Sequence, residues 1–314
     1  MPIVTTDVPI TSARNVQLIQ ALESAYPFIR TRQFGNTAFG RPLWAMTIGN
    51  GERNVIYSAA HHANEWITAY VLLKFAEDLA SAIASGGSVY GVPANTIANA
   101  ATITIIPLVD PDGVDLVTGA IAPGSVEYEL ARTLGSFYPD IPFPDGWKAN
   151  LLGVDLNLQY PAGWLRAREI KFSQGFTRPG PRDFVGRGPL TQLESRALAE
   201  LTDEIDPDLV LAYHTQGKVI YWQFQDYVVP GAEALANDFA RTSGYALEEV
   251  PLESSFAGYK DWFIQNFRRP GFTIEVGEGE NPLPLSQFDE IYGDNLGILT
   301  AAATGLPGVE PSSR

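Results

Sequence analysis

The stretch VIYSAAHHANEWITAYVLLKFAEDLASAIA, residues 55–84, contains an apolar run, a short polar turn and a long helical pattern. The run Val55 to Ala59 is short, apolar and rich in β-branched residues, which is typical of a buried strand. The pattern from Trp66 to Ala84 predicts a helix that ends at Gly86. A buried strand that leads directly into a helix indicates an α/β fold with a largely parallel sheet.

The same alternation continues along the chain. Helices are predicted over Thr191–Ile205, Gly231–Thr242 and Tyr259–Asn266, the first with a capping box formed by Thr191 and Glu194. Four further apolar runs predict strands: Leu43–Ile48, Ile103–Val109, Leu209–Tyr213 and Phe272–Val276. The pattern predicts a mostly parallel sheet with helices on both faces and a ligand site at the carboxyl ends of the strands. Since no repeat or linker interrupts it, we expect a single domain over residues 1–314.

Two segments lack this periodicity. Gly119 to Leu152 and Pro161 to Pro189 are rich in proline, glycine and aromatic residues. We predict long loops for both, because no sustained helical or strand pattern is present. Loops of this length in a compact domain are usually functional or disordered, and the aromatic residues favour ordered walls around a cleft.

The composition excludes several kinds of partner. A formal net charge of -15 gives little reason to bind nucleic acid or an anionic membrane surface. No apolar stretch approaches the roughly 20 residues that span a bilayer, so no membrane span is expected. The absence of cysteine removes thiolate chemistry and disulfides. The N-terminus does not resemble a signal peptide, which leaves a cytoplasmic protein or a processed, secreted form as alternatives.

Three histidines limit any imidazole-based site to His61, His62 and His214. His62 and Glu65 follow the strand predicted at Val55–Ala59, and His214 ends another predicted strand. Two imidazoles and one carboxylate suit zinc and leave one coordination position open, as catalytic zinc sites do. The alternative is that each histidine caps a helix or binds a backbone carbonyl.

Glu275 lies within the apolar run FTIEVG, where burying an ionised carboxylate is costly unless the group is paired or functional. Beside a metal, it could serve as the general base of a hydrolytic reaction. The alternative is an ion pair with Arg268 or Arg269.

Four motifs in the same order give the chain its resemblance to a known family: HHANEW, GVDLN, LAYHTQG and FTIEVG. The chain resembles zinc carboxypeptidases of the carboxypeptidase A type over roughly residues 40–284. The resemblance implies a mixed, mainly parallel eight-stranded sheet and one Zn²⁺ per chain. It implies that His62, Glu65 and His214 are the zinc ligands and that Glu275 is the base that activates the hydrolytic water.

The resemblance also assigns residues that contact the substrate. Lys148, in the segment WKAN, stands where the family uses an arginine to stabilise the oxyanion. Asn157, in GVDLN, falls in a substrate-binding motif. Lys260 precedes Glu275 at the spacing of the family's side-chain specificity pocket. The alternatives are a solvated loop lysine for Lys148 and a solvated helix residue for Lys260.

Two departures concern the family's clamp for a C-terminal carboxylate. Leu158 and Asn64 stand where the family has arginines, so the bidentate clamp of a conventional carboxypeptidase is absent. At its position Asn64 is still expected to be a substrate-binding residue. The residues of these motifs resemble those of a bacterial branch of the family, whose members cleave γ-D-glutamyl-diamino acid bonds in peptidoglycan stem peptides. The resemblance therefore implies a peptide or muropeptide substrate. A conventional metallocarboxypeptidase and an inactive muropeptide-binding relative remain the alternatives.

Overall fold

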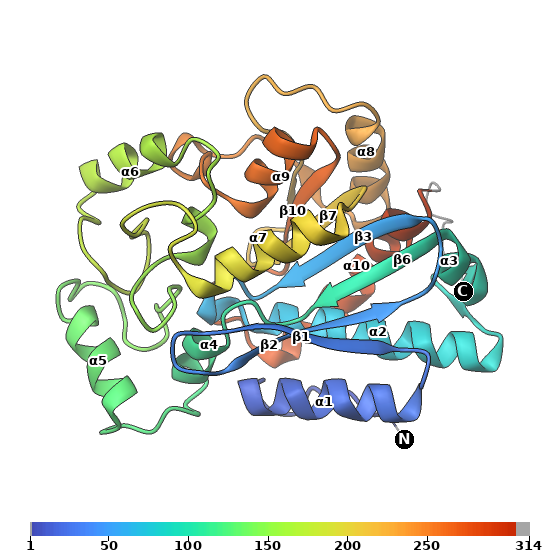
Figure 1. The fold of residues 1–314 in the computed structure, drawn as a ribbon, viewed down its shortest axis with the longest axis horizontal. Helices are drawn as coiled ribbons and strands as arrows, with labels where there is room; N and C mark the ends of the chain where they lie inside the picture. The colour runs from blue at the N-terminus through green and yellow to red at the C-terminus, as the bar shows by residue number, and fades with distance from the viewer. Residues whose placement is uncertain (1, 306–314) are drawn as a thin grey trace.

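The computed structural model, which describes residues 2–305, contains one sheet of eight strands that runs through the molecule (Figure 1). Residues 1 and 306–314 of the predicted domain lie outside the described residues. In order across the sheet, the strands are β1 (Arg30–Asn36), β2 (Pro42–Ile48), β6 (Ala101–Ile106), β3 (Arg53–Ala59), β7 (Leu209–His214), β10 (Gly271–Glu275), β8 (Val219–Tyr221) and β9 (Ala246–Leu247). A separate hairpin pairs β4 (Ser88–Val89) with β5 (Val92–Pro93).

The centre of the sheet is parallel and its flanks are mixed. Strands β6, β3, β7 and β10 run parallel to one another, whereas β1, β2 and β8 pair antiparallel with their inner neighbours. Parallel pairing brings the carboxyl ends of β3, β7 and β10 to one edge of the sheet, where we expected the ligand site. The predicted fold class, a mixed and mainly parallel eight-stranded sheet, is confirmed.

Helices cover both faces of the sheet. The ten α-helices of the described residues are α1 (Ser12–Ala25), α2 (Ile67–Ser85), α3 (Ala94–Ala100), α4 (Pro111–Val117), α5 (Val126–Gly135), α6 (Trp164–Ser173), α7 (Leu193–Ile205), α8 (Ala232–Ser243), α9 (Tyr259–Phe267) and α10 (Phe288–Thr304). In Figure 1, α7 crosses in front of the sheet, while α2 and α10 lie behind it. Within residues 2–305, no helix has both the length and the apolar character needed to cross a membrane.

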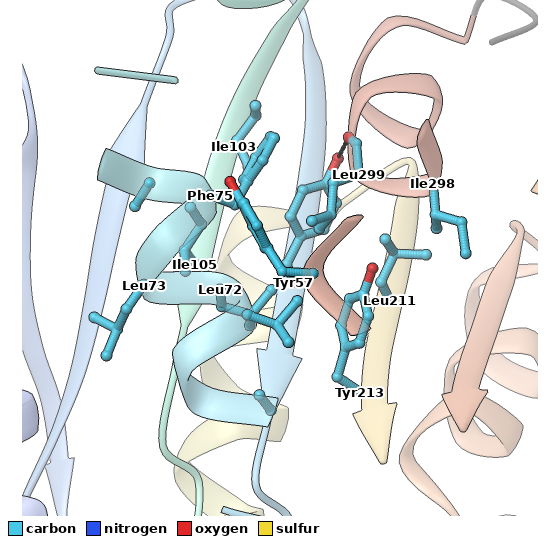
Figure 2. Packing of buried hydrophobic residues seen from close by; sticks show 14 of the residues in the cluster. Tyr57, Leu72, Leu73, Phe75, Ile103, Ile105, Leu211, Tyr213, Ile298 and Leu299 are labelled. Carbon is cyan, nitrogen blue, oxygen red and sulfur yellow. Dashed lines mark hydrogen bonds between the residues drawn. The ribbon is translucent and has the colours of Figure 1, made fainter. Parts of the chain in front are cut away.

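Alternate strand residues face two separate cores because both faces of the sheet are covered. Tyr57 on β3 packs with the residues of α2 and α10, and its hydroxyl donates to the carbonyl of Leu299 at 2.8 Å (Figure 2). Its neighbour Ile56 faces the other core, which contains side chains of α7 and α9 such as Leu198 and Phe263. This two-sided burial explains why the central strands are continuous apolar runs.

The prediction of a capping box at Thr191 and Glu194 is wrong. The helix begins at Leu193, and its N-cap, Gln192, makes no side-chain capping bond. The Thr191 hydroxyl instead lies 3.0 Å from Oε1 of Gln159. Glu194 is buried and accepts a hydrogen bond from Asn150. Tertiary contacts therefore use both side chains that would have formed the cap.

The two segments predicted as long loops also contain regular structure. α5 lies within residues 119–152 and α6 within residues 161–189. Both helices are only 10 residues long. In α6 charged and apolar residues are mixed around the helix, whereas α5 is amphipathic and its pattern was missed because it is short. The parts of these segments outside the helices do form walls of the cavities described below.

Candidate metal centre and active site

Adjacent strands bring the metal-ligating side chains together. His62 and Glu65 follow β3, and Glu65 ends a 3₁₀ turn, Ala63–Glu65, that leads into α2. His214 is the last residue of β7 and lies opposite Glu275, the last residue of β10. The predicted residues thus come from three neighbouring strand ends, as the sequence pattern indicates.

The donor atoms of His62, Glu65 and His214 converge on one point. The two imidazole Nδ1 atoms lie 3.3 Å apart, and each is 2.9 Å from a different oxygen of Glu65. Zinc–ligand bonds of 2.0–2.2 Å place neighbouring ligand atoms of a tetrahedral site about 3.4 Å apart. One atom from each of the three residues lies within 4.8 Å of the other two. The set therefore fits one zinc ion, and the metal that the sequence predicts has its ligands in place.

Hydrogen bonds to neighbouring groups orient these ligands. Nε2 of His62 lies 3.1 Å from Oδ1 of Asp155, a carboxylate–histidine contact that fixes the ring with Nδ1 facing the other ligands. The backbone N–H of Thr215 donates to Oε2 of Glu65 at 3.2 Å. Burial favours a neutral His62, but the carboxylates of Glu65 and Asp155 outweigh it and raise the pKa of His62 to about 9. The two carboxylates thus favour positive charge on His62, whereas burial lowers the pKa of His214.

Lys148 lies at the same centre. Its Nζ is 2.8 Å from Oε1 of Glu65, and its side chain is only 17% exposed. The backbone of this segment is tied to the metal turn, since the N–H of Ala63 donates to the carbonyl of Lys148. The alternative of a solvated loop lysine is wrong.

Glu275 lies at the junction of two cavities. An inner cavity of about 200 Å³ is lined by the three metal ligands and extends to Lys260 and Asp261. An outer cleft of about 790 Å³ shares Lys148, Tyr221 and Glu275 with the inner cavity. The reaction centre therefore has room on both sides of a bond that lies beside Glu275.

Burial raises the pKa of Glu275 to about 8, and the nearby Glu65 carboxylate acts in the same direction. The alternative of an ion pair with an adjacent arginine is wrong. Arg269 instead pairs with Asp206 at 2.7 Å, and Arg268 lies 3.8 Å from the ring centre of Tyr227.

The three predicted substrate-binding residues all line these cavities. Asn64 lies in the outer cleft, where its amide donates to the carbonyl of Asp145. Asn157 lines the inner cavity, and its Oδ1 accepts from the backbone N–H of Tyr259 at the start of α9. Lys260 is 4% exposed and pairs with Asp261 at 2.6 Å, so the alternative of a solvated helix residue is wrong.

Sequence reasoning did not single out Asp155, which contacts His62. It also missed three residues that line the two cavities: Tyr221, Arg182 and Asp261. Asp155 belongs to GVDLN, and its position next to a metal ligand could have been suspected from that motif. Tyr221 follows no motif, and Arg182 lies in a segment without periodicity. Only tertiary structure places them at the metal centre.

Comparisons with known proteins agree with this site. Residues 15–297 match the family described as zinc carboxypeptidase. The γ-D-glutamyl-L-diamino acid endopeptidase 1 of Lysinibacillus sphaericus is 43% identical over 283 residues, which cover 90% of this chain and 69% of that protein.

Solved structures share the fold at low identity. Carboxypeptidase A from Helicoverpa armigera has a TM-score of 0.71 at 16% identity, covering 96% of this chain and 75% of that one. The murein-tripeptide amidase from Escherichia coli O157 has a TM-score of 0.51 at 17% identity, covering 90% of this chain and 93% of that one. At such identities the likeness concerns the fold alone, whereas the match over residues 15–297 and the 43% identical relative concern the family. The chain belongs to the zinc carboxypeptidase family, and it is a zinc metallopeptidase.

Proposed function

We propose that this enzyme hydrolyses the bond between the γ-carboxyl of a D-glutamyl residue and a diamino acid in peptidoglycan stem peptides or muropeptides. The observation that carries the proposal is a complete metal and base set in a cleft whose terminal-carboxylate clamp is missing. Leu158 and Asn64 stand at the positions of the two family arginines. The substrate named for the 43% identical Lysinibacillus sphaericus relative supports the same reaction.

The residues of this chain divide the chemistry between them. Bound zinc would be held by His62, Glu65 and His214, and it would polarise the scissile carbonyl and favour ionisation of water. Glu275 accepts the proton of the attacking water and then delivers it to the leaving amine. The ammonium group of Lys148 stabilises the negative charge that develops on the carbonyl oxygen. As a point charge, Lys148 does this without the paired contacts of an arginine.

The inner cavity suits the leaving diamino acid. Lys260 and Asp261 present an ammonium and a carboxylate side by side at its wall, 2.6 Å apart. The distal carbon of diaminopimelate carries both an amino and a carboxyl group. Its carboxylate can pair with Lys260 and its ammonium group with Asp261. A substrate with lysine in place of diaminopimelate offers only the amine, so Lys260 has no partner in that substrate.

The two cavities that meet at Glu275 give room for an acyl residue and a leaving residue on either side of the scissile bond. A conventional carboxypeptidase needs a cationic clamp for the terminal carboxylate, and Leu158 offers none. The inactive alternative is disfavoured because Glu65 is a buried carboxylate and Glu275 a half-buried one, and such groups are costly to keep without a function.

The test is mass spectrometry of the products from L-Ala-γ-D-Glu-diaminopimelate and matched peptides. We expect free diaminopimelate and L-Ala-D-Glu. Peptides with an α-linked glutamate should remain intact. Release of C-terminal residues from ordinary α-peptides, with the γ-linked peptide uncleaved, would establish the conventional carboxypeptidase instead. Binding without any cleavage by the zinc-loaded protein would establish the inactive relative.

A further inference from the structure

Arg182 is a cation of the outer cleft that the metal centre does not use. Its Nε donates to Oδ2 of Asp183 at 2.6 Å, and the other oxygen of Asp183 lies 2.6 Å from Nζ of Lys171. Asp183 and Lys171 are buried, whereas the side chain of Arg182 is 42% exposed. The guanidinium is therefore held at its base by a buried ion pair while its outer part faces the cleft.

The segment that carries Arg182 is fixed to the metal site by backbone hydrogen bonds. The carbonyl of Pro181 accepts from the backbone N–H groups of Lys148 and Ala149, at 2.7 and 2.9 Å. The N–H of Asp183 donates to Asp155 at 3.3 Å, and Asp155 in turn contacts His62. Arg182 is thus positioned by the same groups that position the oxyanion lysine and a metal ligand.

The charges around Arg182 leave its outer amino groups available. Asp183 is shared between two cations, Lys171 and Arg182, and the carboxylates of Asp155 and Glu65 also act on Arg182 from a greater distance. Lys148 is already paired with Glu65. Within residues 2–305, the guanidinium makes no hydrogen bond other than that of its Nε. Two parallel N–H groups of an arginine fit a carboxylate in a bidentate contact.

A γ-linked D-glutamyl residue brings a carboxylate to this side of the bond. Because the peptide bond uses the side-chain carboxyl, the α-carboxyl group stays free a few carbons from the scissile carbonyl. An α-linked residue with a neutral side chain has no carboxylate there, whereas an α-linked glutamate carries its γ-carboxylate the same number of carbons away and differs in the position of its amide nitrogen. The diamino acid occupies the inner cavity, which Arg182 does not line. Arg182 lines the outer cleft and also a smaller cavity of about 100 Å³ that it shares with His62 and Lys148, and we place the acyl residue in the outer cleft.

We propose that Arg182 binds the free α-carboxylate of the D-glutamyl residue and so favours this residue over its α-carboxamide. The inference rests on the proposed function. It adds a residue that recognises the substrate on the acyl side of the scissile bond. In a chain with a net charge of -15, a fixed cation in the cleft also offsets the general repulsion of an acidic substrate.

Two peptides that differ in one group test the proposal. In the first, the D-glutamyl α-carboxyl is free; in the second it is the carboxamide, D-isoglutamine. We expect the parent enzyme to prefer the free acid by roughly 10- to 150-fold in kcat/KM, the range of a charge-assisted contact. Arg182→Met should lose this preference by slowing cleavage of the acid peptide and leaving the amide peptide near its parent rate. Arg182→Lys should keep part of the preference for the acid peptide.

Arg178→Met is the matched control, since Arg178 lies in the same loop and contacts the ring of Phe137. Zinc content and thermal unfolding of each variant show that the centre and fold are intact. Equal losses on both peptides would mean that Arg182 only supports the loop and would overturn the proposal. A loss that instead follows amidation of the diamino acid carboxyl would place the contact on the leaving side and overturn it too.

The parent enzyme separates this inference from the function on which it rests. Equal cleavage of the acid and amide peptides by the parent would overturn the role of Arg182 while leaving the γ-D-glutamyl peptidase in place. Cleavage of neither peptide would overturn both.

Discussion

His214 and Glu275 lie directly opposite each other at the carboxyl ends of β7 and β10, two adjacent parallel strands. A metal ligand and a half-buried carboxyl group are thus held in register by the hydrogen bonds of the sheet. We expect Glu275→Gln to keep its zinc and lose about 10²–10⁴-fold in kcat, because the amide cannot accept the proton. Steady-state kinetics with metal analysis measures both, and Glu278→Gln, an exposed residue of the following loop, is the control. Near-normal turnover of Glu275→Gln would refute the base assignment.

His62→Ala and His214→Ala should each lower zinc content, because each removes one of three converging donors. Asp155→Asn should weaken zinc affinity by about 10- to 100-fold, since it alters the hydrogen bond that orients His62. Chelation should abolish activity and leave most of the circular dichroism unchanged, because a core on both faces of the sheet does not depend on the metal. Full zinc occupancy in both alanine variants would disprove the ligand set.

Lys148→Met should reduce kcat by about 10²–10³-fold and change KM little, because its charge acts mainly on the developing oxyanion. Lys148→Arg should recover more activity than the methionine variant. Zinc content is the essential second measurement, since Lys148 also contacts Glu65. If the methionine variant loses zinc in proportion to activity, Lys148 supports the metal ligand and not the oxyanion.

Lys260→Met should reduce cleavage of the diaminopimelate peptide by roughly 10- to 150-fold while the lysine peptide is less affected. Asp261→Asn should produce the complementary loss on substrates with a distal amine, because it removes the carboxylate of the pair. Competition assays with both peptides in one tube measure the preference directly. An unchanged preference in both variants would exclude the pair from substrate recognition.

Glu194 should make the fold less stable as the pH rises. Burial raises its pKa from 4.5 to about 7, and the charge of Asp112 acts in the same direction. Between these values the folded chain holds a proton that the unfolded chain has released, so stability declines from about pH 4.5 to pH 7. The loss is on the order of 3 kcal/mol at about 1.4 kcal/mol per pKa unit. Glu194→Gln should flatten the dependence of the free energy of unfolding between pH 5 and pH 8. If the free energy of unfolding of the variant fell with pH as steeply as that of the parent, this assignment would be wrong.

The central strands could be predicted because burial on both faces makes them apolar throughout, as in Leu209–His214. The edge strand Arg30–Asn36 could not, because its exposed, polar residues owe their extended form to pairing with β2. β8 and β9 are too short to give a periodic signal.

The candidate site divides in the same way. His62, Glu65 and His214 follow strand ends, so topology alone predicts that they meet. Lys148 and Arg182 lie in segments without periodicity, and backbone hydrogen bonds through Pro181 bring them together. No local pattern encodes that contact, which is why Arg182 became visible only in the structure.

The position of β10 between β7 and β8 has a consequence for biosynthesis. Its neighbours precede it in the sequence, so the strand must insert between two segments that the ribosome has already released. A nascent chain that ends before Gly271 carries all three metal ligands but not Glu275. Such a chain lacks the group that moves the proton, and hydrolytic competence arrives only with the last strand of the sheet. The peptidase therefore gains its general base only once synthesis has passed residue 275.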